Sequence, residues 1–206
     1  LILTTKPEKL IIQAAADALA HAVEAYLSRI ASPFTEMQSL KAIDLIMRNL
    51  EDAVNTRSLD SLEQLSVASI SASMAFSNAG LGAEHALAHS LGGYFDIPHG
   101  NVHPILLTAV MRFNLDYSPE KLATIGRVIL GQRLGSELET AQGGIEKLEE
   151  FFASFNVSLK LRHEIEEGKK HYLDKICKMA VNDACNLTNP RPATWKELLA
   201  ICQEVW

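Results

Sequence analysis

Apolar residues recur at intervals of three and four along most of this 206-residue chain, and this helical period restricts its fold more than any other feature. Residues 9–29 show the period most clearly. Sustained alternation of period two, which marks strands, is nearly absent, and aromatic residues make up only 6% of the chain. We therefore expect an all-α fold.

The expected helices are separated by residues that commonly end helices. The second helix should begin at a cap offered by Thr35, residues 76–82 read as a turn-like linker, and Gly92 and Gly93 should end a short helix. Residues 131–144 are the stretch that the pattern defines least. The chain shows no internal repeat and no domain boundary, so residues 1–206 are predicted to form a single helical domain. The predicted helices are 9–29, 35–55, 59–74, a short one ending at 91, 101–113, 119–130, 145–155, 171–186 and 194–204.

Composition excludes several classes of protein. A hydrophobic content of 48% is too high for a disordered chain, and a net charge of −6 without a basic block argues against nucleic acid or an anionic membrane as partner. Apolar runs such as Ile105 to Met111 are too short to cross a bilayer. Three scattered cysteines form no disulfide framework, which favours a cytoplasmic location. The chain opens at Leu1 and reads as a piece of a longer protein.

Histidine is concentrated in one short window. Four of the seven histidines fall between residues 85 and 103, where a uniform scatter would place about 0.6. Asp17 and His21 are four residues apart on one expected helix, as are His85 and His89 on another, and alanines surround both pairs. Because a buried carboxylate among neutral imidazoles needs a compensating cation, the pattern favours a divalent metal site, such as Fe²⁺ or Zn²⁺, over an ordinary polar core.

Four segments together resemble one known family. They are DALAHAVEAY from Asp17, FSNAGLGAEHALAHSLGG from Phe76, PHG from Pro98, and NDACNLTNPRP from Asn182. This combination is similar to that of the iron-containing (group III) alcohol dehydrogenases, and the likeness covers essentially the whole chain.

The resemblance implies a particular ligand set. It assigns the metal to Asp17, His21, His85 and His99, and it places His89 beside the substrate and the nicotinamide as the candidate catalytic and cofactor-binding residue. Spacing alone groups His89 with His85, so the resemblance corrects that grouping. Two further residues, Phe76 and Asn78, are implied in the substrate pocket, although packing and turn roles explain them equally well.

The resemblance also implies an architecture and a reaction. Residues 1–206 correspond to the C-terminal all-helical domain of the dehydroquinate synthase-like and iron-containing alcohol dehydrogenase type, and the N-terminal α/β domain that binds NAD or NADP is absent from this chain. The implied reaction is the reversible oxidation of a small alcohol to an aldehyde or ketone, with Fe²⁺ (or Zn²⁺) polarising the alcohol oxygen. Members of the family commonly form homodimers, so the resemblance also implies a homodimer.

Some residues depart from the family pattern, and other functions remain open. His103 follows His99 by one turn, and we expect it to be a helix N-terminal residue with a satisfied side chain; His163 and His171 are expected on the surface.

The alternatives to an iron-dependent alcohol dehydrogenase are a metal-binding helical module without catalysis, a zinc-dependent glycerol dehydrogenase-like enzyme, and a metallohydrolase that activates water.

Overall fold

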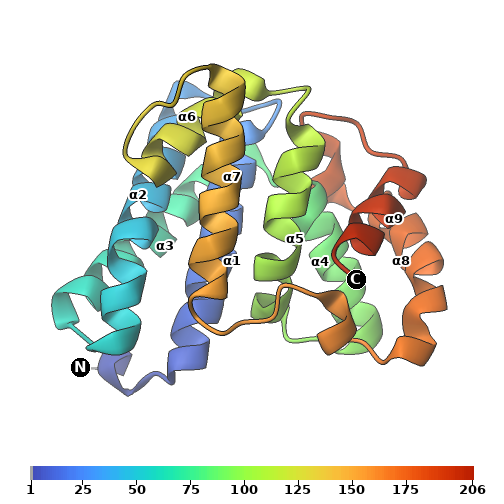
Figure 1. Cartoon of the computed structure of the whole chain (residues 1–206), viewed down its shortest axis with the longest axis horizontal. Helices are drawn as coiled ribbons and strands as arrows, with labels where there is room; N and C mark the ends of the chain where they lie inside the picture. The colour runs from blue at the N-terminus through green and yellow to red at the C-terminus, as the bar shows by residue number, and fades with distance from the viewer. Residues whose placement is uncertain (1) are drawn as a thin grey trace.

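The computed structural model describes residues 2–206 and confirms the all-α prediction: the chain is 77% helical, and these residues contain no strand. Within residues 2–206, nine α-helices and four short 3-10 helices follow one another (Figure 1). Their bounds are η1 (Ile2–Thr5), α1 (Glu8–Leu27), α2 (Pro33–Asn55), α3 (Leu59–Ala79), α4 (Ala83–Phe95), α5 (His99–Asn114), α6 (Pro119–Leu130), α7 (Glu137–Ala153), η2 (Leu161–His163), η3 (Glu167–Tyr172), α8 (Leu173–Ala180), η4 (Ala184–Thr188) and α9 (Trp195–Glu204).

The helices surround two hydrophobic cores. The first is built mainly by α1, α2, α3, α6 and α7, and the second by α4, α5, α8 and α9. In Figure 1, α2 and α3 lie towards one end of the molecule and α8 and α9 towards the other, with α1, α5 and α7 between them. Helix α1 contacts both α4 and α5, so the boundary between the two cores runs along these three helices.

Several helix ends differ from the sequence expectation. The cap of α2 is Ser32, whose side chain accepts from the backbone N–H of Thr35, and Thr35 is the partner residue of this capping box. Helix α3 continues to Ala79, through most of the expected linker. Helix α4 continues through Gly92 and Gly93 to Phe95 and ends at the left-handed Asp96. In the last two cases tertiary packing outweighs local propensity.

The region that the sequence pattern defined least contains the start of α7 and a close helix crossing. Ser136 and Glu139 form a capping box at the start of α7. Gly126 of α6 faces Gly144 of α7 so closely that a Cβ on Gly144 would lie 2.4 Å from the Cα of Gly126. Glycine at both positions therefore allows the two helix backbones to touch.

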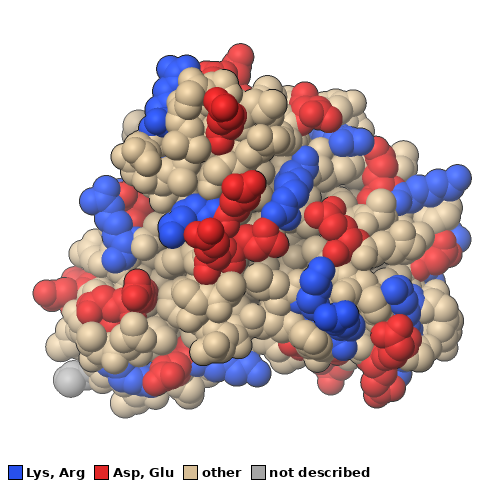
Figure 2. Space-filling view, viewed as in Figure 1, with Lys and Arg blue, Asp and Glu red and all other residues tan. Residues whose placement is uncertain are grey.

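Helix α1 is the central helix of the first core. It is long and apolar enough to cross a membrane by length and composition alone, but 72% of the apolar window is buried within the fold, as expected for a core helix. On the surface, Lys and Arg are interspersed with Asp and Glu over the face that Figure 2 shows.

Candidate metal centre

One face of α1 presents three polar side chains to the boundary between the cores. Asp17, His21 and Glu24 follow one another at spacings of four and three residues, which places them in a row along the helix. Glu24 is buried, whereas Asp17 and His21 are partly exposed. Small neighbours such as Ala16 and Ala20, both fully buried, allow α4 and α5 to approach this face.

Glu24 links α1 to the first turn of α4. One carboxylate oxygen accepts a hydrogen bond from the backbone N–H of Glu84 at 2.7 Å, and the other lies 2.7 Å from Nδ1 of His85. A carboxylate is favoured here because helix N-termini carry unpaired N–H groups and partial positive charge. Gly82 makes room for it, since a Cβ on this residue would lie 2.6 Å from Glu24 Oε1. The ring of His85 is therefore held with Nε2 directed away from Glu24.

The same arrangement is repeated between α4 and α5. The buried carboxylate of Glu84 lies 3.0 and 3.1 Å from Nδ1 of His103, the fifth residue of α5. It also lies 3.1 Å from Nδ1 of His85. The residue before the proline of α5 is thus a fully buried histidine whose Nδ1 is bound by a carboxylate.

The free ring nitrogens converge on one oxygen atom, Oδ1 of Asp17. Nε2 of four histidines surrounds it, at 3.2 Å for His103, 3.4 Å for His21, 3.5 Å for His85 and 3.8 Å for His99. One donor atom each from Asp17, His85, His99 and His103 lies within 4.8 Å of the other three, a set to which His21 does not belong. The structure therefore brings the four sequence-predicted ligands together and adds His103 to them.

Three of these atoms are buried without any hydrogen-bond partner: Oδ1 of Asp17, Nε2 of His85 and Nε2 of His103. The expectation that His103 has a satisfied side chain is therefore wrong for its Nε2. Buried polar atoms normally have partners, because an unpaired one costs about 1–3 kcal/mol. Three such atoms facing one another indicate that the site is completed by a bound group.

The charges of the site also favour a bound cation. Asp17, Glu24 and Glu84 are three carboxylates whose ion pairs, among residues 2–206, are formed only with histidine and not with Lys or Arg. Burial disfavours the ionised form of Glu84, but the charge and hydrogen bonds of His103 and His85 outweigh it and hold its pKa well below the usual range. Burial likewise opposes ionisation of Asp17, but the close approach of the rings of His103 and His85 and the charge of His21 outweigh it and hold its pKa well below the usual range.

The pKa values of the histidines divide them into two groups. Burial lowers the pKa of His21 to about 4, helped by the charge of His85, and burial also lowers the pKa of His99. For His103 and His85 burial acts in the same direction, but their carboxylate partners outweigh it and raise the pKa of His103 to about 9 and that of His85 further. Because a metal ligand nitrogen must be free of its proton, a raised pKa at these two rings makes protons compete with a metal for them.

The donor set fits a divalent first-row metal. Two ligands about 2.1 Å from a metal at tetrahedral or octahedral angles lie about 3.0–3.4 Å apart, close to the separations around Asp17 Oδ1. Imidazole nitrogens with a single carboxylate suit Fe²⁺ or Zn²⁺ and provide no soft sulfur ligand. The carboxylates behind His85 and His103 are the partners that metal-bound histidines commonly have on their second ring nitrogen.

His89 lies beside this cluster and not within it. Its ring is 44% exposed and stacks on that of His99, with centroids 5.5 Å apart, and its Nδ1 lies 3.1 Å from Oδ2 of Asp183. His89 is therefore on the open side of the site, held by a carboxylate of the segment between α8 and η4. Its role beside a substrate and a nicotinamide, which the resemblance implies, stays a prediction.

The two residues predicted for the substrate pocket lie in different surroundings. Phe76 stacks on the ring of His21, with centroids 4.3 Å apart, and so covers one side of the cluster. Asn78 is exposed and donates a hydrogen bond to Met74 O of its own helix. The histidines predicted on the surface, His163 and His171, are exposed.

A second buried polar cluster lies on the other side of Gly82. Asn114 and Asn189 exchange hydrogen bonds through their carboxamides, at 3.2 and 2.9 Å. Asn189 also accepts from the backbone N–H of Ala83 at 3.2 Å and donates to Arg191 O at 2.7 Å. All of these groups are paired within the chain, so this cluster is complete without a ligand.

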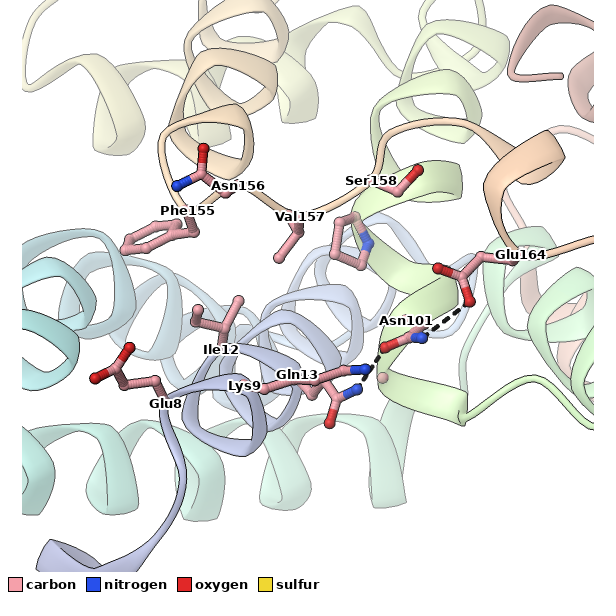
Figure 3. A pocket seen from close by; sticks show the side chains of 12 residues that line it. Glu8, Lys9, Ile12, Gln13, Asn101, Phe155, Asn156, Val157, Ser158 and Glu164 are labelled. Atoms are coloured by element: carbon pink, nitrogen blue, oxygen red, sulfur yellow. Dashed lines mark hydrogen bonds between the residues drawn. The ribbon is translucent and has the colours of Figure 1, made fainter.

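A cavity of about 410 Å³ lies near the first turns of α1 and α5, apart from the metal cluster (Figure 3). Gln13, Asn101 and Glu164 form a chain of side-chain hydrogen bonds along one edge. None of the candidate metal ligands lines this cavity. It does not explain the unpaired atoms of the metal cluster.

Sequence reasoning missed Glu24, Glu84 and the role of His103. Glu24 carries a usable signal, because it lies seven residues after Asp17 and therefore on the same face of α1. Glu84 has no such signal, since its neighbour His85 belongs to the same first turn and only the packing of α5 brings His103 to it.

An all-helical fold that brings one carboxylate and several imidazole nitrogens to one point is typical of helical domains that bind a metal ion. The chain belongs to the iron-containing alcohol dehydrogenase family: the model for the C-terminal part of that family, "Fe-containing alcohol dehydrogenase family, C-terminal", matches residues 11–206. This finding confirms the resemblance drawn from the four sequence segments.

Relatives of known activity are similar over this whole chain. It is 38% identical to the 1,3-propanediol dehydrogenase of Klebsiella pneumoniae over 100% of this chain and 53% of that protein, and 34% identical to the lactaldehyde reductase of Escherichia coli (strain K12) over 92% and 49%. A solved 1,3-propanediol oxidoreductase has a TM-score of 0.93, with 37% identity, over 98% of this chain and 53% of that one. The chain thus spans about half the length of the relatives it matches.

Proposed function

We propose that this chain is the metal- and substrate-binding part of an alcohol dehydrogenase that interconverts a small alcohol with its aldehyde or ketone using NAD or NADP. The convergence of three buried, unpaired donor atoms on one point carries this proposal. The activities for which two relatives are named, on 1,3-propanediol and on lactaldehyde, support a small hydroxylated substrate. A zinc-dependent enzyme of the same architecture is the alternative for the metal.

The residues divide the work of such a reaction. The metal is held by Asp17, His21, His85 and His99. When bound, it acts as a Lewis acid that makes the alcohol hydroxyl more acidic. Glu24 fixes the ring of His85 through Nδ1, so that Nε2 faces the site. Phe76 stacks on the ring of His21 and limits its movement. Asp17 is the only anionic group among these four ligands, so a divalent metal with its direct ligands carries a net positive charge, while the carboxylates of Glu24 and Glu84 lie behind the imidazole rings.

His89 is the candidate for moving a proton. Asp183 binds Nδ1, which leaves Nε2 as the nitrogen that exchanges a proton with the substrate or solvent. Its exposed position beside His99 supports this role, because an exposed imidazole next to a metal ligand is accessible to a substrate. We propose that the hydride acceptor approaches the metal from this exposed side.

The experiment is metal analysis together with activity, on the protein purified without oxygen. About one iron or zinc per chain is expected in the parent and little in Asp17→Ala and His99→Ala, with NAD(P)⁺-dependent oxidation of 1,3-propanediol lost in both variants. His171→Ala, which alters an exposed histidine, is the control. Metal without alcohol oxidation, with an intact nicotinamide-binding part present, would favour the non-catalytic module; metal-dependent ester or amide hydrolysis would favour a hydrolase.

A further inference from the structure

We propose that His103 is itself a ligand of the metal, and that Glu84 is the residue that positions it. This inference rests on the proposed function, since it concerns the same metal. It enlarges the set of candidate protein ligands to five, one carboxylate and four imidazoles. His103 and Glu84 lie outside the set that the family resemblance assigns.

The position of the His103 ring carries the first part of the argument. Its Nε2 is the nitrogen nearest to Asp17 Oδ1, at 3.2 Å, whereas Nε2 of His99 is 3.8 Å away. The mutual set of four donor atoms within 4.8 Å includes His103. If the ligands are chosen by distance alone, His103 is therefore included ahead of His21.

Burial carries the second part. His103 is fully buried and its Nε2 has no hydrogen-bond partner, while the partly exposed His99 and His21 are reached by water. A buried imidazole with one paired and one unpaired nitrogen is costly unless the second nitrogen also binds something. Asp17 Oδ1 lies 3.2 Å from that nitrogen and is itself unpaired. A cation between the two atoms pairs both.

The third part of the argument concerns Glu84, because the presence of a carboxylate in the core has to be explained. It is fully buried, it contacts Nδ1 of both His103 and His85, and it forms no ion pair with Lys or Arg among the described residues. A carboxylate on the far nitrogen of a metal-bound histidine fixes its tautomer and makes its near nitrogen a stronger ligand. Glu84 and His103 thus repeat the relation of Glu24 and His85.

The test counts metal-bound imidazoles directly. The protein is loaded with Co²⁺, whose unpaired electrons shift the proton resonance of each imidazole N–H on a bound ring far from its normal position. His85 and His103 bind through Nε2, so their buried Nδ1–H groups should give two slowly exchanging, shifted resonances. One of these should be missing in His103→Gln, while His163→Gln, which alters an exposed histidine, should keep both.

The variant of Glu84 tests the positioning role. In Glu84→Gln the resonance of His103 should move and exchange faster with solvent, and chelator competition should show Co²⁺ bound at least about tenfold more weakly. A structural role of Glu84 alone would leave the resonance in place. This variant also keeps the test valid if His103→Gln does not fold, as judged by circular dichroism.

Two results separate the failure of this inference from that of the proposed function. If the parent binds Co²⁺ and His103→Gln retains every shifted resonance, His103 is not a ligand, and the proposed function stands. If the parent takes up neither Co²⁺, Fe²⁺ nor Zn²⁺, the metal of the proposed function fails, and the inference fails with it.

Discussion

Two buried polar clusters lie on either side of Gly82, and they differ in whether the chain completes them. The Asn114–Asn189 cluster pairs its carboxamide groups with one another and with the backbone. The metal cluster leaves Asp17 Oδ1, His85 Nε2 and His103 Nε2 unpaired. Both lie where α4 begins and both link elements distant in sequence. We infer from this difference that a closed cluster, whose polar groups are all paired within the chain, stabilises the fold. An open cluster, which has unpaired donor atoms, is able to bind a ligand.

The largest effect is expected from breaking the closed cluster. Asn189→Ala leaves the carboxamide of Asn114 and the N–H of Ala83 without their partner, so the free energy of unfolding should fall by about 3 kcal/mol. Chemical denaturation measures it, with and without metal, and the loss should be the same in both. Asn182→Ala, on an exposed asparagine, is the control; a loss that added metal abolishes would contradict the assignment as a closed cluster.

The open cluster should respond to metal instead. At a free metal concentration about 100 times the Kd, the parent should gain about 2.7 kcal/mol of unfolding free energy, because metal binds the folded state. Asp17→Asn should lose this gain, since it removes the anionic ligand from the centre of the donor set. Asp44→Asn, which alters a carboxylate paired with Arg48 on the surface of α2, should retain it. An equal metal response in both variants would place the metal elsewhere.

Gly82 is the point where the two clusters meet, and a methyl group there should disturb both. A Cβ would lie 2.6 Å from Glu24 Oε1 and 2.8 Å from Asn189 Oδ1, so Gly82→Ala should cost about 2 kcal/mol and also weaken metal binding. Thermal unfolding and metal titration measure the two effects. Gly93→Ala is the matched control, because a Cβ there meets nothing within 4 Å. Loss of stability with unchanged metal affinity would show that the clusters are independent.

The smallest effect concerns a closed polar group on the surface, the capping box of α7. Hydrogen bonds from the side chain and backbone of Ser136 hold the pKa of Glu139 below its ordinary value. A carboxylate whose pKa is lower in the folded state stabilises it above the unfolded pKa, and this contribution is lost as the pH falls through the folded pKa. Between about pH 6 and about pH 3, the Tm of Glu139→Gln should therefore fall less than that of the parent. Parallel curves would contradict this role.

The helices could be predicted from sequence because their apolar period is local information. Residues 119–130 match α6 exactly in length, and the predictions for residues 9–29 and 194–204 agree with α1 and α9 within two residues. One error falls where packing overrides propensity, since Gly92 and Gly93 lie within α4, next to the fully buried Leu91. Two other predictions were wrong in length: the helix expected at 145–155 is the longer α7 (Glu137–Ala153), and the one expected at 171–186 contains only the short α8 (Leu173–Ala180) between two 3-10 helices.

The metal site could be predicted only in part, for a related reason. The spacing of Asp17 and His21, and of His85 and His89, reveals which residues share a helix face. It does not reveal which faces meet, so spacing alone placed His89 in the cluster, whereas the structure places it beside the cluster. The carboxylates behind the rings, Glu24 and Glu84, depend on how α4 and α5 are packed against α1.

The two bonds of Glu24 also bear on how fast metal is exchanged. The same carboxylate accepts from the first turn of α4 and holds the ring of His85, so this ligand swings aside only when that turn opens. Under the proposed function, exchange of one metal for another should then depend on the frequency of a local opening of α4, and not on the strength of the metal bonds alone. Such a site should retain its metal through brief changes in the supply around it.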